Sequence, residues 1–146
     1  IVHLATHTVF PPGDSARPRI ALSLRPDGSP GLLAAEDIAA LRLNADLVVM
    51  SACRSASADY ASGAGLLGLT RSWLAAGARQ VLATLWPVGD DATAFFQTFH
   101  GHLAAGGNLS AGAPSALRQA QLAALRAGGP AASPRHWAGY VVLSRR

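Results

Sequence analysis

The sequence predicts an α/β fold built around a mostly parallel β-sheet. Four short runs of β-branched and bulky apolar residues alternate with segments in which apolar residues recur at helical spacing. Such alternation of strand and helix is typical of layered α/β proteins with a parallel sheet. The chain has 146 residues, the length of one ordinary domain. We therefore expect residues 1–146 to form a single α/β domain.

The predicted strands are continuous apolar runs, as expected for strands that are buried on both faces. They cover residues 1–6, 46–52, 80–86 and 137–143. A further short strand is expected at 20–24, before a turn at 25–31. Because the sequence opens inside an apolar run without an initiator methionine, we expect a piece of a longer protein, with further strands upstream.

Four segments between the strands have the spacing of amphipathic helices. They cover residues 33–43, 66–76, about 92–105 and 115–127. Asp90 and Asp91 precede the third helix as capping candidates, and Pro114 stands directly before the fourth. Pairs of glycines, at 106–107 and 128–129, are expected to end these two helices. The segment 104–114 is expected to be a loop.

Composition excludes several classes of protein. Only 14% of residues are charged, without a long charge run, which excludes a disordered acidic or basic tail. The net charge is +4, but the 12 basic residues are all arginines scattered along the sequence. Abundant Ala, Gly, Pro and Arg without Lys is typical of a GC-rich genome, so we expect a bacterial protein. The absence of a basic stripe argues against nucleic-acid binding.

The single cysteine excludes an internal disulfide. No apolar run approaches the ~18 to 20 residues that a membrane span requires. We therefore expect a cytoplasmic protein with no membrane partner. His100 and His102 lie two apart on a predicted helix and point in different directions, so they cannot share a metal ion. Neither a metal nor a cofactor is expected.

Chemically competent side chains follow three of the predicted strands. His7 follows the first, Cys53 the second, and Asp90 and Asp91 come shortly after the third. The reactive crevice of an open parallel sheet lies beyond the carboxyl ends of its strands, so we expect these groups to meet at one edge. A thiol beside an imidazole is a typical cysteine nucleophile, because the imidazole stabilises the thiolate and later protonates a leaving amine.

Each of these residues also has an ordinary structural interpretation. A lone cysteine after a strand is commonly a small buried hydrophobe, and a lone histidine is commonly a polar residue with satisfied hydrogen bonds. Either aspartate can cap the helix that begins near Ala92. His3, inside the first predicted strand, is expected to be a buried strand residue without a catalytic role.

A glycine pattern in the second half of the chain imitates a dinucleotide-binding motif. Gly63, Gly65 and Gly68 form GxGxxG, with Asp90 22 residues beyond the last of them. The Rossmann motif needs its glycines in the turn directly after a strand, whereas residues 53–62 intervene here. A nucleotide-binding α/β domain therefore remains a weaker alternative.

Five segments, in order and over nearly the whole chain, resemble the CHAT family. They are HLATHT at 3–8, ADLVVMSAC at 45–53, the run from GAGLLGL to GDDAT at 63–93, ALRQAQLAAL at 116–125 and HWAGYVVLS at 136–144. CHAT domains are caspase-like, are related to separases and are often joined to tetratricopeptide repeats. The spacing of His7 and Cys53 also resembles the caspase signature, in which the histidine precedes the cysteine by about 50 residues.

The resemblance implies a caspase-like three-layer αβα sandwich, of which this chain supplies the C-terminal four or so strands. It also implies a cysteine endopeptidase with His7 and Cys53 as its catalytic dyad. The backbone N–H groups of Thr8 and Cys53 would form the oxyanion hole, and Asp90 and Asp91 would bind a basic side chain of the substrate, as in separases. The implied partners are a protein or peptide substrate and an upstream sensor or tetratricopeptide repeat domain in the same protein.

Some positions depart from the pattern of the family. The residue after the histidine is usually glycine but is Thr8 here, and the usual acidic residue, Thr and Gly after the cysteine are Arg54, Ser55 and Ala56. The Gly-Glu-Gly ahead of the second helix is Gly-Ala-Gly at 63–65. A catalytically inactive interaction or regulatory module with the same fold therefore remains the main alternative.

Overall fold

The structure is a computed structural model. It describes residues 1–11, 17–51, 63–86, 88, 92–107, 109–129 and 132–145. Of these, residues 63–67 and 109–111 are described by their backbone alone. The predicted nucleophile Cys53 and the predicted substrate-binding pair Asp90 and Asp91 lie outside the described residues.

Four strands form the central sheet, as the apolar runs predict. In spatial order they are β1 (Val2–Leu4), β5 (Leu47–Met50), β6 (Gln80–Thr84) and β7 (Tyr140–Ser144). The first three run parallel, and β7 is antiparallel to β6. Every residue of β5 and β6 is buried. The sheet is therefore mostly parallel, and its central strands are covered on both faces.

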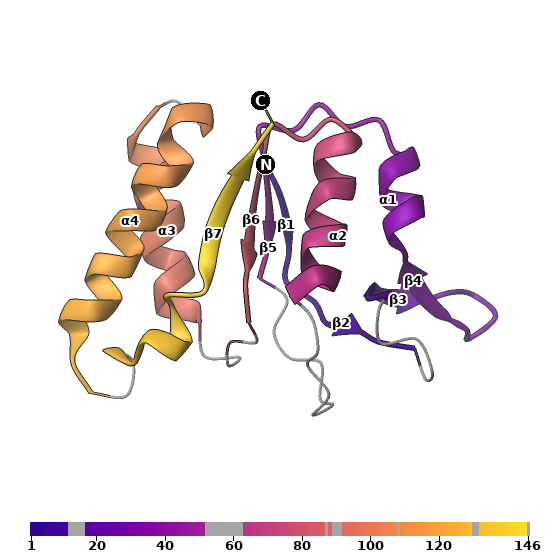
Figure 1. Cartoon of the computed structure of the whole chain (residues 1–146), viewed down its shortest axis with the longest axis horizontal. Coiled ribbons are helices and arrows are strands. Elements are labelled where there is room, and N and C mark those ends of the chain that lie inside the picture. Colours follow the sequence, from indigo (N-terminus) through magenta and orange to yellow (C-terminus); the bar gives the residue numbers. More distant parts are fainter. Residues whose placement is uncertain are drawn as a thin grey trace.

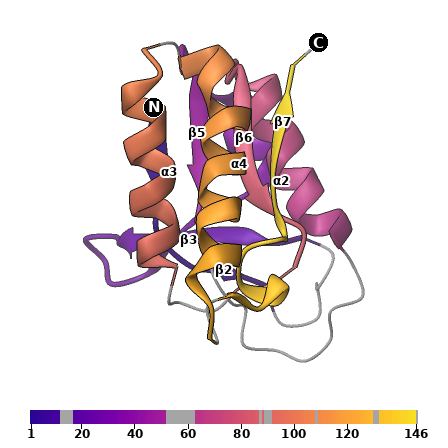
Figure 2. The ribbon, with the colours of Figure 1, turned by 90° about the vertical axis from the view of Figure 1, so that its left-hand side faces the viewer.

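Helices cover both faces of this sheet (Figure 1). One face carries α1 (Ala35–Ala40) and α2 (Gly63–Ala75). The other carries α3 (Thr93–Ala105) and α4 (Leu109–Ala127), which lie side by side across the strands in Figure 2. The three-layer αβα arrangement expected for a caspase-like fold is therefore present.

Each face of the sheet has its own apolar core. On the α1–α2 side, Ile38, Leu69 and Trp73 pack against alternate residues of β5 and β6. On the α3–α4 side, Phe99 and the other aromatic residues of α3 pack with Tyr140 of β7. This division follows from strand geometry, because successive side chains of a strand point to opposite faces.

The register of β1 and β5 brings their carboxyl ends together. Leu4 pairs with Met50, and these residues end the two strands. His7 lies three residues beyond the first and Cys53 three residues beyond the second. The parallel pairing therefore ends both strands at the same edge of the sheet, shortly before the predicted catalytic residues in the sequence.

A second, antiparallel sheet was not fully expected from the sequence. It contains β2 (Thr8–Val9), β3 (Arg19–Leu24) and β4 (Pro30–Leu33) in that order. Only β3 was predicted, as a short strand at 20–24. The helix predicted at 33–43 is α1, which covers only Ala35–Ala40: β4 takes up Leu33 at its start, and the helix ends before Leu41. Short strands such as β2 form because a neighbouring strand supplies hydrogen-bond partners, and this is not visible in local apolar spacing.

The helix ends were predicted with mixed success. α4 begins at Leu109, five residues before Pro114, so the prediction of a loop at 104–114 is wrong over its second half. Ala113, which is fully buried, packs this first part of α4 into the core. The predicted ends of α3 and α4 at glycine pairs are confirmed: α3 ends before Gly106 and Gly107, and Gly128 follows α4 with a φ of 71°.

Within the part of the chain that the structure describes, no helix combines the length and the apolar character needed to cross a bilayer.

Candidate active site

A cavity of about 300 Å³ lies at the carboxyl edge of β1 and β5. Its walls come from segments far apart in the sequence: β1 with the residues after it, the first residue after β5, and the first turn of α3 with the residue before it. The lining residues are His3, Ala5, Thr6, His7, Ser51, Ala92, Thr93 and Phe96. This is the edge of the sheet at which the strand exits predict a reactive crevice.

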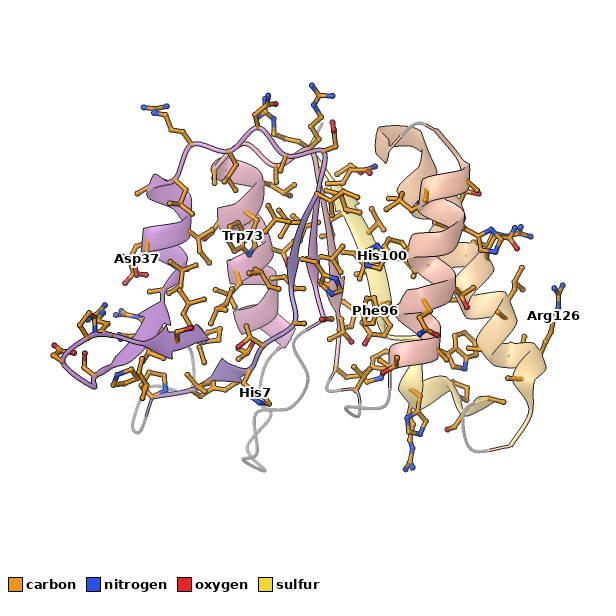
Figure 3. All side chains as sticks on the ribbon, turned by 180° about the vertical axis from the view of Figure 1, so that it is seen from behind. His7, Asp37, Trp73, Phe96, His100 and Arg126 are labelled. Atoms are coloured by element: carbon orange, nitrogen blue, oxygen red, sulfur yellow. The ribbon has the colours of Figure 1, made fainter. Side chains whose placement is uncertain are left out.

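His7, the predicted catalytic histidine, lines this cavity. Its side chain is exposed and projects from the segment between β1 and β2, at the lower end of the sheet in Figure 3. The segment that carries it is tied to β3 at two points: the Thr6 hydroxyl donates to the Ala21 carbonyl oxygen at 2.6 Å, and the Ala21 N–H donates to the His7 carbonyl oxygen at 2.9 Å. The imidazole is thus accessible on a fixed backbone.

The end of β5 reaches the same cavity through Ser51. The Ser51 N–H donates to the Leu4 carbonyl oxygen at 3.2 Å, so the parallel pairing continues one residue past β5. Ser51 is two residues before Cys53 in the sequence. The cysteine lies outside the described residues, but Ser51, the residue after β5, lines the same cavity as His7.

Thr8, the predicted oxyanion donor, lies in β2 opposite Ile20. Because Ala21 bonds to the residue before it, Thr8 occupies a non-hydrogen-bonded position of the antiparallel pair, and its N–H points away from β3. The residue is only 5% exposed, and its side chain contacts a small apolar cavity with Leu4 and Met50. Since threonine is favourable in a strand, this position does not require glycine.

The predicted substrate-binding aspartates flank described residues of the site. Ala92, which follows Asp91, lines the cavity together with Thr93. The N-cap of α3 is Ala92 itself, which makes no side-chain capping bond. The N-cap position is therefore not an aspartate, and the roles of Asp90 and Asp91 remain predictions.

His3 differs from its prediction. It is an exposed residue of β1, not a buried one, and it lines the cavity near His7. Its Nε2 lies 2.9 Å from Ser51 Oγ, and its Nδ1 lies 3.2 Å from Nε2 of His100 on α3. Because β1 is at the edge of the sheet in this chain, one side of the strand stays open and the ring reaches α3.

The two histidine rings are held in an aromatic setting. The His3 ring centroid lies 5.0 Å from that of His100 and 5.4 Å from that of Phe96. Figure 3 shows Phe96 and His100 on the side of α3 that faces the sheet. Partial burial lowers the pKa of His3, and the nearby His100 lowers it further; burial also lowers the pKa of His100. Both rings therefore favour the neutral form.

Two other features of the site bear on the alternatives. Among the described residues, no three His, Cys, Asp or Glu side chains gather as a metal site. The GxGxxG pattern lies within α2, which begins at Gly63 and runs through Gly65 and Gly68. These glycines do not form the strand-to-helix turn that a dinucleotide-binding motif requires, which weakens the nucleotide-binding alternative.

Comparison with known proteins gives one matching family and two similar proteins. The sequence profile described as CHAT domain matches residues 1–145. The chain is similar to tetratricopeptide repeat protein 28 of Mus musculus, with 36% identity over 113 residues, and to that of Homo sapiens, with 33% identity over 113 residues. Each alignment covers 77% of this chain but only 4% of the relative.

Proposed function

This chain belongs to the CHAT domain family, and from that premise we propose that it is a caspase-like cysteine endopeptidase. The proposed catalytic residues are Cys53 as nucleophile and His7 as general acid and base. The observation that carries the proposal is the paired ending of β1 and β5. Because the two strands end side by side, the residues that follow them, His7 and Ser51, line one cavity.

The proposed reaction has two stages. The Cys53 thiolate attacks the carbonyl carbon of the scissile peptide bond and forms a C–S bond. The C–N bond then breaks, and the leaving amine takes a proton from the imidazolium of His7. A water molecule next attacks the thioester, gives a proton to His7 and releases the carboxylic acid product and the thiolate. No metal or cofactor takes part.

The proposed oxyanion hole uses the backbone N–H groups of Thr8 and Cys53. In its favour, the N–H of Thr8 points away from β3 and is not consumed by that strand pairing. An oxyanion donor of this kind typically contributes a factor of about 10² to 10³ in kcat. Because a backbone N–H is the donor, its contribution does not depend on the threonine side chain.

A reactive peptide probe tests the proposed nucleophile. We expect a peptide with an electrophilic carbonyl to label Cys53 in the full-length protein. Cys53→Ala should abolish labelling and lower cleavage at least about a thousandfold, because nucleophile removal is among the most severe changes in such enzymes. His7→Gln should lower kcat by about 10² to 10⁴, whereas His102→Gln, on the exposed side of α3, should leave it unchanged.

The proposed substrate preference is for Arg or Lys immediately before the cleaved bond. It is supported by Asp90 and Asp91, which directly precede the cavity residues Ala92 and Thr93. The double substitution Asp90→Asn and Asp91→Asn should remove the preference for basic over neutral peptides, measured as the ratio of kcat/KM values. An unchanged ratio would leave these aspartates without a role in specificity.

A non-catalytic interaction module is the second candidate function. It is favoured by the burial of Thr8, which is 5% exposed, since an oxyanion donor must reach the substrate. The residues after the cysteine, Arg54, Ser55 and Ala56, also depart from the family pattern. Absence of Cys53 labelling in the full-length protein would favour this function over peptidase activity.

We also propose that this chain works beside tetratricopeptide repeats in the same protein. The supporting observation is that the two matched relatives are named as tetratricopeptide repeat proteins. In such an arrangement the repeats would bind a partner and present the substrate to the domain. The sequences on either side of this chain in its gene would test this directly.

A further inference from the structure

Three side chains form a hydrogen-bonded link across the wall of the candidate active site. His100 of α3 lies 3.2 Å from His3 of β1, measured from Nε2 to Nδ1. His3 Nε2 in turn lies 2.9 Å from Ser51 Oγ at the end of β5. We name these three residues the histidine–serine bridge. It joins three elements whose sequence positions span 97 residues.

One arrangement of protons satisfies every contact in the bridge. The Ser51 hydroxyl donates to the Leu4 carbonyl oxygen at 3.3 Å, and Ser51 Oγ accepts from His3 Nε2. His3 Nδ1 then accepts from His100 Nε2. Both imidazoles are neutral in this arrangement, each with one donor and one acceptor nitrogen. The lowered pKa values of the two histidines agree with it.

We propose that the histidine–serine bridge is a positioning element: it fixes the end of β5 and through it the reactivity of Cys53, the proposed nucleophile that follows in the sequence. This inference rests on the proposed peptidase function. Ser51 is two residues before Cys53, and its partner Leu4 is three residues before His7. The bridge therefore acts at the last paired position of the two strands, shortly before the proposed catalytic residues in the sequence.

The geometry explains why side chains are needed at this point. Beyond Met50 the β1–β5 ladder ends, and the Ser51 N–H makes a backbone bond of 3.2 Å to Leu4. The Ser51 side chain adds a second bond to the same carbonyl oxygen and a third to His3. Three bonds from one residue restrain the direction in which β5 leaves the sheet more strongly than one bond does.

His100 and Phe96 fix the orientation of the His3 ring. The ring centroids of His3 and Phe96 lie 5.4 Å apart, and Phe96 is only 9% exposed. Nδ1 of His3 is hydrogen-bonded to His100, so Nε2 is the ring nitrogen that bonds to Ser51. The same helix begins at Thr93 in the cavity wall, directly after the segment that carries Asp90 and Asp91. The bridge thus ties the helix behind the proposed specificity segment to the proposed nucleophile strand.

The test uses the full-length protein and two readouts at Cys53. Ser51→Ala should lower kcat for peptide cleavage by about 10- to 100-fold with KM changed less than about 3-fold, because misplacement of a reacting group by about 1 Å has this effect. The pH midpoint for alkylation of Cys53 by iodoacetamide should rise, because a thiol farther from His7 loses stabilisation of its thiolate. Ser51→Thr keeps the hydroxyl and should restore both values.

His100→Gln tests the bridge from its far end without altering β5. It should lower kcat in the same direction as Ser51→Ala but by a smaller factor, about 3- to 10-fold, and should also raise the alkylation midpoint. Since His100 is a partly exposed helix residue, this variant is expected to fold even if Ser51→Ala does not. His102→Gln on the same helix is its matched control.

Ser72→Ala is the matched control for Ser51→Ala. The Ser72 hydroxyl donates to the Gly68 carbonyl oxygen at 3.2 Å within α2, so the variant loses one serine hydrogen bond away from the cavity. It should leave kcat and the alkylation midpoint at their original values. An equal effect of Ser51→Ala and Ser72→Ala would show a general loss of stability and overturn the proposal.

The two proposals fail in different ways. If Cys53-dependent cleavage is present but Ser51→Ala and His100→Gln change neither kcat nor the alkylation midpoint, the positioning role is wrong and the peptidase stands. If the protein cleaves no peptide but both variants raise the alkylation midpoint, the bridge positions the thiol and the peptidase proposal is wrong.

Discussion

The central sheet has one edge where its parallel strands begin and one where they end, and different kinds of hydrogen bonds hold these two edges together. At the edge where β5 and β6 begin, the loops are joined through their backbones: the Leu43 N–H donates to Ala76 at 2.8 Å and the Arg79 N–H to Ala45 at 2.9 Å. At the edge where β1 and β5 end, one backbone bond joins Ser51 to Leu4, and side chains add further links through His3, Ser51 and His100.

This difference separates structural from functional positions. The backbone bonds at the first edge form whatever side chains these residues carry. The exception is a position where two backbones approach so closely that only glycine fits. At the second edge, side chains surround a cavity of about 300 Å³. Substitutions at the first edge should therefore alter stability, whereas those at the second should alter chemistry, as is common for α/β proteins whose sites lie at strand carboxyl ends.

Gly77 gives the largest expected effect on stability and lies at the first edge. It has a φ of 114°, and an added Cβ would clash with the Leu43 carbonyl oxygen. Gly77→Ala should therefore lower the free energy of unfolding by about 2 to 4 kcal/mol, measured by urea denaturation. Gly107→Ala is the matched control, because its φ is 65° but nothing lies within 4 Å of the added Cβ. Equal losses for both variants would show that the close approach to Leu43 contributes nothing.

The pH dependence of stability should come from the second edge and be intermediate in size. The pKa values of His3 and His100 lie below the ordinary value of 6.5 in the folded protein, so the unfolded chain binds protons first as the pH falls. Stability that is fully present above about pH 6.5 should decline as the pH falls through the lower folded pKa values. Urea denaturation between pH 7.5 and 5 measures this decline.

His100→Gln should make the decline shallower, because it removes one of the two rings and its effect on the other. The stability of the His102→Gln variant, altered on the same helix, should fall with pH as that of the unaltered protein does. Identical pH profiles for all three proteins would show that the histidine pair does not couple to folding.

The smallest expected effect is at the first edge, at the ion pair of Arg79 and Asp46. The two groups lie 2.9 Å apart, but their side chains are 64% and 38% exposed. Arg79→Gln should change the free energy of unfolding by less than about 0.5 kcal/mol, because exposed ion pairs are screened by water and salt. A loss above 1 kcal/mol would mean that side chains also hold this edge together.

Several elements could be predicted because their signals are local. The strands β5 and β6 read as continuous apolar runs, and all of their residues are buried. Gly106 and Gly128 mark helix ends in the sequence as in the structure. The position of His7 after β1 also followed from the sequence, because a parallel strand delivers its next residues to a known edge.

Other elements depended on partners that are distant in the sequence. β2 is two residues long and is a strand only because it pairs with β3. The start of α4 was predicted too late, since burial of Ala113 against the core carries the helix past the position where Pro114 suggests a boundary. His3 was expected to be buried, yet it is exposed and bonded to Ser51.

The sequence by itself determined the layer architecture and the edge of the sheet at which His7 lies, because apolar periodicity and strand direction are properties of consecutive residues. Only the tertiary structure decided that His3 meets His100 and Ser51. Those contacts depend on the register of β1 with β5 and on how α3 crosses the sheet. Packing energies summed over the whole domain set both of these, and no single segment encodes them.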